Sequence, residues 1–167
     1  PLLRRPFSVR RANEAGLVIL YEVVGKGSEA LARKKPGEYL DMIGPLGQGF
    51  KAQGCEDFFE GHSIIVAGGM GVAPLLFLAE KLKHRKLLVL IGAKTKSQIL
   101  CAGEFKKFGC AVKIATDDGS RSFKGKVTDL LKRKLSAIRY PLSAIYACGP
   151  RPMLKEIVSE ELKDKEF

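Results

Sequence analysis

The chain has 167 residues, of which 46% are hydrophobic and 28% charged, and its formal net charge is +11. This balance is typical of a globular protein with its own core, and no apolar run approaches the roughly 20 residues that a membrane-spanning helix needs. The basic residues occur in short scattered pairs without interleaved aromatic residues, which argues against a nucleic-acid surface and favours anionic ligands or acidic partners. The start of the chain does not resemble a signal peptide, so we expect a cytoplasmic protein.

The first third of the chain alternates short β-rich runs with turns that contain glycine or proline. Runs of this composition predict strands, and a serine before a short helical patch at residues 28–33 predicts an N-cap at Ser28. Three strands are too few to close a barrel, and the chain starts at proline, so we expect further strands upstream. We therefore predict that residues 1–56 are part of an antiparallel β-barrel domain. The predicted strands are residues 7–11, 17–24 and 39–43.

From residue 57 onward, short apolar strands alternate with helical segments. This order is typical of a parallel sheet that is covered by helices on both faces. We therefore predict that residues 57–167 form a doubly wound α/β domain. The predicted strands are residues 63–67, 87–91, 111–116 and 143–147, and the predicted helices are about residues 72–84, 97–108, 127–135 and 152–163.

A glycine turn follows the first of these apolar strands, with the spacing G-G-x-G-x-x-P from Gly68 to Pro74. Glycines at such a turn let a phosphate approach the backbone, and the following helix start attracts anions. Pro74 fits the first helical turn, where its missing N–H has no intrahelical partner. Alternatively, these glycines serve only the close packing of helix on strand, because the spacing differs from the usual dinucleotide-binding fingerprint.

A second small-residue turn, Cys148-Gly149-Pro150, follows the last predicted strand. The carboxyl ends of parallel strands lie at one edge of a sheet, so both turns are expected to open on the same edge. Cys148 could contact a planar ring there, or it could simply fill space. The four cysteines contain no C-x-x-C pair and accompany only two histidines, which predicts free thiols and no metal site.

Taken together, these motifs resemble the ferredoxin-reductase superfamily. Residues 5–8 (R-P-F-S) are similar to its flavin motif, residues 68–74 to its nicotinamide motif, and residues 148–150 to its C-G-P, all in the expected order. Within that superfamily, the stretches L-R-R-P-F-S-V, G-P-L-G-Q-G-F and T-D-D-G-S resemble the electron-transfer subunits of dihydroorotate dehydrogenase B.

The resemblance implies two cofactor sites. FAD would be bound by Arg5, Pro6, Phe7, Ser8, Leu20, Tyr21, Glu22, Gly27 and Ser28. The nicotinamide nucleotide would be bound by Gly68, Gly69, Gly71, Val72, Pro74, Gly149, Pro150 and Met153, with Cys148 as the catalytic residue beside the nicotinamide. Asp117 and Asp118 are expected to end a strand on the same edge, where one of them would face the adenosine ribose and favour NADH. Alternatively, they form only the turn before Gly119, and Arg121 nearby would have the opposite effect and favour NADPH.

The implied function is electron transfer between a nicotinamide nucleotide and FAD, and then through a [2Fe–2S] cluster to a partner. That partner would be the FMN-bearing catalytic subunit of dihydroorotate dehydrogenase, in a hetero-oligomer of pyrimidine biosynthesis. We expect the cysteine-rich cluster segment to lie outside these 167 residues. Two alternatives are the small subunit of an NADPH-dependent ferredoxin or sulfide oxidoreductase, and a non-catalytic nucleotide-binding module without flavin.

Overall fold

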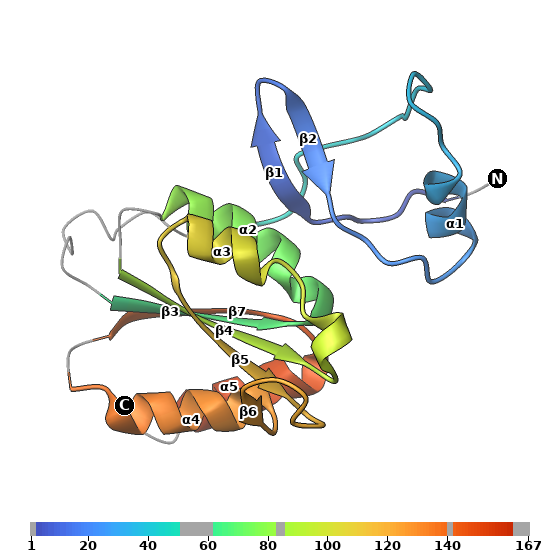
Figure 1. The fold of residues 1–167 in the computed structure, drawn as a ribbon. Helices are drawn as coiled ribbons and strands as arrows, with labels where there is room; N and C mark the ends of the chain where they lie inside the picture. Colours follow the sequence, from blue (N-terminus) through green and yellow to red (C-terminus); the bar gives the residue numbers. More distant parts are fainter. Residues whose placement is uncertain (1–2, 51–61, 83–85, 140–141, 162–167) are drawn as a thin grey trace.

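The computed structural model describes residues 3–50, 62–82, 86–139 and 142–161 (Figure 1). It contains a two-stranded antiparallel sheet followed by a five-stranded parallel sheet. The predicted fold class, an antiparallel β part followed by a doubly wound parallel sheet, is confirmed at this level. Cys55 and the predicted domain boundary after residue 56 lie outside the described residues.

The parallel sheet has the strand order β6-β5-β4-β3-β7. Four of its strands were predicted within a residue or two at each end, whereas β6 was missed because it has only two residues, too few for a periodic signal. The strands are β3 (His62–Gly68), β4 (Lys86–Ala93), β5 (Ala111–Thr116), β6 (Phe123–Lys124) and β7 (Leu142–Cys148).

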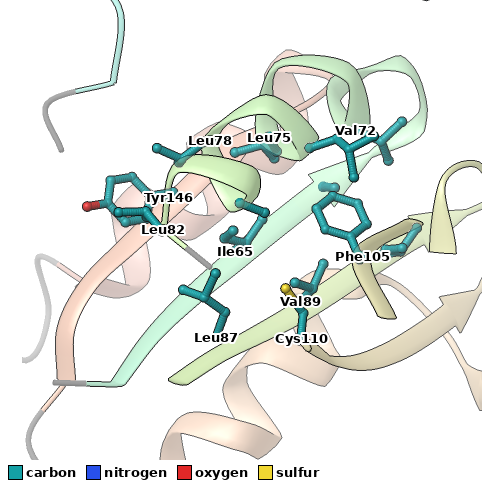
Figure 2. Packing of buried hydrophobic residues seen from close by; sticks show 14 of the residues in the cluster. Ile65, Val72, Leu75, Leu78, Leu82, Leu87, Val89, Phe105, Cys110 and Tyr146 are labelled. Carbon is teal, nitrogen blue, oxygen red and sulfur yellow. The ribbon is translucent and has the colours of Figure 1, made fainter. Parts of the chain in front are cut away.

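Helices cover both faces of this sheet. Figure 1 shows α2 (Val72–Lys81) and α3 (Ala102–Lys107) on one face, and α4 (Val127–Ala137) and α5 (Arg151–Glu161) on the other. Side chains of β3 alternate between the two resulting cores, as the period of a strand requires: Ile65 packs with α2 and α3, and Ile64 packs with α4 and α5. Figure 2 shows the first core, where Ile65 lies between Leu75 of α2 and Val89 of β4.

The predicted helix at residues 97–108 is shorter than expected. A single 3₁₀ turn, Lys96–Gln98, is followed by extended residues, and the α-helix α3 begins only at Ala102. Cys101 has the left-handed backbone angle φ = 57°, which interrupts a right-handed helix. The extended residues Ile99 and Leu100 pack against the core on the α2 face, so burial of these side chains outweighs their helical propensity.

Between residues 3 and 50, the N-terminal part has one hairpin and one short helix. Strands β1 (Val9–Asn13) and β2 (Gly16–Ile19) form the hairpin, so the strand predicted at residues 17–24 ends five residues earlier than expected. The predicted strand at residues 39–43 is wrong. That segment pairs with no strand among the described residues, and Tyr39 is 96% exposed, because a β-rich sequence without a partner forms no ladder.

The short helix α1 spans Lys26–Ala32, so it begins two residues before the predicted start. Ser28 is therefore not its N-cap but its third residue, and Gly25 occupies the cap position. The Ser28 hydroxyl accepts hydrogen bonds from the N–H groups of Val24 and Gly25, at 2.9 and 3.2 Å. The Ser28 hydroxyl therefore accepts hydrogen bonds from backbone N–H groups that precede the helix, whereas an N-cap side chain would accept them from N–H groups in its first turn.

Several contacts among the described residues join the N-terminal part to the parallel sheet and its helices. Strand β1 lies along α2 (Figure 1), and Leu20 packs against the core on that face. Arg10 of β1 forms an ion pair with Glu104 of α3, and both side chains are largely screened from solvent. No helix within the described ranges is both long and apolar enough to cross a membrane.

Candidate nucleotide site

The order of the strands marks one crevice in the parallel sheet. From β3 the chain proceeds outward to β4, β5 and β6, and it then returns to add β7 on the other side of β3. Connections of opposite direction leave a crevice at the carboxyl ends of β3 and β7, which is where open α/β sheets bind ligands. Both predicted turns lie there, since residues 69–71 follow β3 and residues 149–150 follow β7.

The two turns are in direct backbone contact. A Cβ atom placed on Gly71 would lie 2.1 Å from the carbonyl oxygen of Cys148, and one placed on Gly149 would lie 3.0 Å from the Cα of Gly68. A Cβ on Gly68 would meet the sulfur of Met153 at 2.7 Å. Close packing therefore explains the glycines at positions 68, 71 and 149, whether or not a ligand binds.

Gly69 differs from its neighbours. Its φ of 53° is left-handed, and a Cβ at this position would meet nothing within 4 Å. The next helix, α2, starts without a side-chain cap and has no acidic residue in its first turn, which contains Pro74. An open backbone beside a helix start that has no side-chain cap is suited to an anionic group, so Gly69 and the start of α2 at Val72 favour binding over packing alone.

Cys148 lies at the point where the two turns meet, as the last residue of β7. It is half-buried and packs against the core on the α2 face. This burial raises the pKa of its thiol, so the sulfur stays protonated at neutral pH. Such a thiol is a poor nucleophile, but it can still form the apolar wall of a site for a flat ring. The thiols of Cys101 and Cys110 are also free.

The two predicted ribose ligands have different environments. The carboxylate of Asp118 accepts hydrogen bonds from the N–H of Ser120 at 2.9 Å and from its hydroxyl at 2.7 Å, and these bonds lower the pKa of Asp118. Asp118 thus builds the turn before Gly119. Asp117 is exposed, and within the described part of the chain its carboxylate has no hydrogen-bond or ion-pair partner.

The predicted flavin residues come together in two pairs. The side chain of Arg5 lies against Gly27, where an added Cβ would be 3.3 Å from the Arg5 Cγ. The rings of Phe7 and Tyr21 meet edge to face, with centroids 5.7 Å apart. Residues 3–8 therefore run beside residues 20–28, although the two motifs are separate in sequence.

The remaining predicted flavin residues are more scattered. Pro6, Ser8 and Glu22 are exposed, whereas Leu20 packs against the core on the α2 face. Ser28 is only 8% exposed, and its hydroxyl donates a hydrogen bond to the carbonyl oxygen of Gly25. The hydroxyl of Ser28 therefore maintains the turn before α1, which differs from the predicted donation to a phosphate.

Two interactions that shape the site region were missed at the level of sequence. The ring of Phe50 meets that of Tyr146 on β7 edge to face, with centroids 6.0 Å apart, which ties the end of the G-P-L-G-Q-G-F stretch to the strand that carries Cys148. Arg10 pairs with Glu104, which lies 94 positions later. The stretch ending at Phe50 was a usable signal, but no local pattern indicates a partner as distant as Glu104.

A family model described as the oxidoreductase NAD-binding domain matches residues 65–159, from the middle of β3 to α5. The matched segment contains both glycine turns and the helices α2, α3 and α4, and it ends within α5. The chain belongs to this family.

The similarity to known proteins extends beyond this domain and covers nearly the whole chain. The electron transfer subunit of dihydroorotate dehydrogenase B (NAD(+)) from Desulforamulus reducens is 44% identical over 162 residues, which are 94% of this chain and 59% of that protein. The structure of an NADH-dependent reduced ferredoxin-NADP oxidoreductase is 27% identical, with a TM-score of 0.69 over 93% of this chain and 60% of its own. Ferredoxin-NADP+ reductase from Plasmodium falciparum is 17% identical, and its structure matches 97% of this chain and 73% of its own length with a TM-score of 0.77. This likeness supports the fold.

Proposed function

We propose that this chain is part of a flavin-dependent electron-transfer subunit that exchanges electrons between NAD(H) and a partner protein. The observation that carries the proposal is the open, left-handed backbone at Gly69 beside the start of α2, at the crevice between β3 and β7. In this proposal, residues 1–56 belong to a flavin-binding domain and residues 57–167 form the nucleotide-binding domain.

The nucleotide half of the proposal rests on the carboxyl edge of the sheet. The open backbone at Gly69 and the uncapped start of α2 suit a pyrophosphate, and Asp117 has a free carboxylate for ribose hydroxyls. Gly149, Pro150 and Met153 would shape the floor of the crevice, since Pro150 and Met153 already pack against Gly68.

The flavin half rests on the paired motifs of the N-terminal part. Arg5 is exposed: its Nη1 donates hydrogen bonds to the carbonyl oxygens of Leu3 and Arg4, and its other guanidinium N–H groups could pair with a phosphate. The Phe7–Tyr21 ring pair offers an apolar surface on the same two segments. FAD, when bound, would exchange a hydride with the nicotinamide ring. Residues of this chain would hold the two rings in register and exclude water, and the protonated thiol of Cys148 would border the nicotinamide.

The relatives support the choice of partner in this proposal. The 44% identical protein is named as an electron transfer subunit of dihydroorotate dehydrogenase B, so we assign the partner as the FMN-bearing subunit that oxidises dihydroorotate. Single electrons from the partner would pass through a [2Fe–2S] cluster, expected outside these 167 residues, to FAD, which would supply them in pairs to NAD+. The free carboxylate at Asp117 favours this NAD-dependent role over the NADPH-dependent sibling, because a 2′-phosphate would be repelled there.

The test uses the full-length subunit under anaerobic conditions, with NADH added and the visible flavin band recorded. We expect the band to bleach, and a protein that keeps its flavin oxidised would refute the oxidoreductase function. Asp117→Asn should weaken NADH binding by about tenfold, the equivalent of one charge-assisted hydrogen bond. Asp118→Asn is the matched control: it should leave NADH affinity within about twofold, because that carboxylate faces Ser120. Equal effects of both variants would reject Asp117 as the ribose ligand.

A further inference from the structure

The outer edge of the parallel sheet carries a second pocket, away from the glycine turns. Strand β5 pairs with β4 along its whole length, but it pairs with the edge strand β6 only at Ala115 and Thr116. Residues 111–114 therefore have no strand on their outer side among the described residues. Unpaired backbone groups at such an edge are a template for another strand.

The pocket, of about 340 Å³, follows this open edge. Its walls come from the end of α3 on one face of the sheet and from α4 on the other, and apolar side chains such as Ile114, Phe123 and Leu130 lie between them. The charged lining residues are all basic: Lys106, Lys113, Arg121, Arg133 and Lys134.

The positive charge of this pocket is uncompensated. Within the described residues, none of the five basic side chains forms an ion pair, and no acidic residue lines the pocket. Three of the acidic residues near the pocket in sequence are engaged elsewhere: Asp129 accepts a hydrogen bond from the N–H of Lys126, Glu104 pairs with Arg10, and Asp118 accepts hydrogen bonds from Ser120. Asp117 follows β5 directly, but it does not line the pocket. The pocket thus concentrates positive charge on both sides of an unpaired strand edge.

We propose that this edge, the β5 pocket, binds an acidic, extended segment of a partner protein, which adds a strand beside residues 111–114. The open backbone edge, the apolar side chains and the basic residues of the pocket each have a role when a strand is added. The free backbone edge supplies main-chain hydrogen bonds, the apolar floor accepts alternate side chains, and the basic rim pairs with acidic side chains between them. The proposal does not depend on the nicotinamide site.

A protective role for the edge lysine is compatible with this selectivity. Lysine on an edge strand disfavours pairing with neutral or basic strands, and Lys113 has that position in β5. The positive charge of Lys113 also attracts an acidic strand. One residue therefore disfavours neutral or basic strands and favours the acidic one.

The experiment measures binding of fluorescein-labelled peptides to the full-length subunit by anisotropy. The first probe alternates glutamate with valine, and the second has the same sequence with N-methylated valines, which lack the backbone donors for pairing. We expect the first to bind at least about tenfold more tightly, and hydrogen exchange of residues 111–114 to slow only when it is bound. A single-stranded DNA of equal charge should bind no better than the methylated peptide.

Charge variants locate the site. The double variant Lys113→Glu, Arg133→Glu should weaken binding of the first peptide by about tenfold or more, since two charge pairs become repulsive. The matched control, Lys35→Glu with Lys155→Glu, makes the same change in net charge at exposed positions outside the pocket and should bind as the wild type does. Retained NADH binding would show that the variants fold. Equal binding of the methylated peptide or the DNA, or equal loss in the control variant, would overturn the proposal.

Discussion

The two parts of this chain differ in how completely their side chains are buried. In the parallel sheet, Ile65 and Val66 of β3 are completely buried between two layers of helices. In the N-terminal part, every residue from 33 to 50 is exposed, and the hairpin β1–β2 has only one face against α2. The parallel sheet with its helices therefore supplies most of its own stability, whereas the N-terminal part depends on a few contacts with α2, α3 and β7.

This difference explains how the candidate site is divided. The nucleotide turns are held by backbone contact between two adjacent strands, so their geometry is fixed by the sheet itself. The proposed flavin residues are held by side-chain pairs such as Phe7–Tyr21, and the N-terminal part is attached by Arg10 and Phe50. Substitutions at the turns should therefore act on global stability, and substitutions at the attachments should act locally.

The largest effect is expected for Gly71→Ala. The new methyl group would lie 2.1 Å from the carbonyl oxygen of Cys148, and backbone at the junction of two buried strands cannot move aside cheaply. We expect the free energy of unfolding to fall by about 3 kcal/mol, which urea denaturation followed by circular dichroism would measure.

Gly103→Ala is the matched control for that substitution. Gly103 lies in α3, and a Cβ there would meet nothing within 4 Å, so alanine should raise the free energy of unfolding by roughly 0.5 kcal/mol through its better helix propensity. Should Gly71→Ala unfold at the wild-type urea midpoint, the contact between the turns would not be a constraint and the contrast between the two parts would fail.

A smaller and more local effect is expected for Arg10→Ala. The Arg10–Glu104 pair joins β1 to α3, and its side chains are 21% and 33% exposed, so screening by water is incomplete. We expect the local stability of the hairpin to fall by about 1 kcal/mol. Hydrogen exchange should then be faster in β1 and β2, with little change in β3.

Arg33→Ala provides the comparison for Arg10→Ala. Arg33 pairs with Glu29 inside α1, and these side chains are 77% and 49% exposed, so the change should be close to zero. If exchange in the hairpin were equally fast in both variants, Arg10 would not attach the N-terminal part.

The fold of the parallel sheet could be predicted because its signals are local. Short apolar strands such as residues 63–67 alternate with helical segments, and burial on both faces of one sheet explains both features. The strand predicted at residues 39–43 failed because composition cannot reveal whether a partner strand is present. The helix start at Lys26 was missed because Ser28 can bond backward from inside the first turn as well as forward from a cap.

The candidate site was predictable to the extent that its residues lie in turns of special composition. The carboxyl edge brings Gly68, Gly71 and Cys148 together as the parallel sheet requires. The sequence could not separate Asp117 from Asp118, because that depends on which carboxylate the hydroxyl of Ser120 reaches. The pocket along β5 was also invisible, since Lys106, Lys113 and Arg133 are distant in sequence and meet only through the strand order.

The smallest effect, a dependence on pH, should also separate the two parts, because the three described cysteines all belong to the parallel sheet and its helices. Burial raises the pKa of the thiols of Cys101, Cys110 and Cys148. As pH rises above about 8.5, the thiols of an unfolded chain lose their protons first, while the folded protein keeps them. The stability contributed by the neutral thiols is therefore complete below that pH, and it declines as pH rises through the pKa values of the folded protein.

Urea midpoints should therefore fall between pH 8 and pH 10, roughly the range in which thiols titrate. Cys110→Ala should make this decline shallower, whatever the substitution costs in stability at pH 7. A decline of the same slope in that variant would mean that the alkaline loss arises from lysines or tyrosines instead of from the buried thiol.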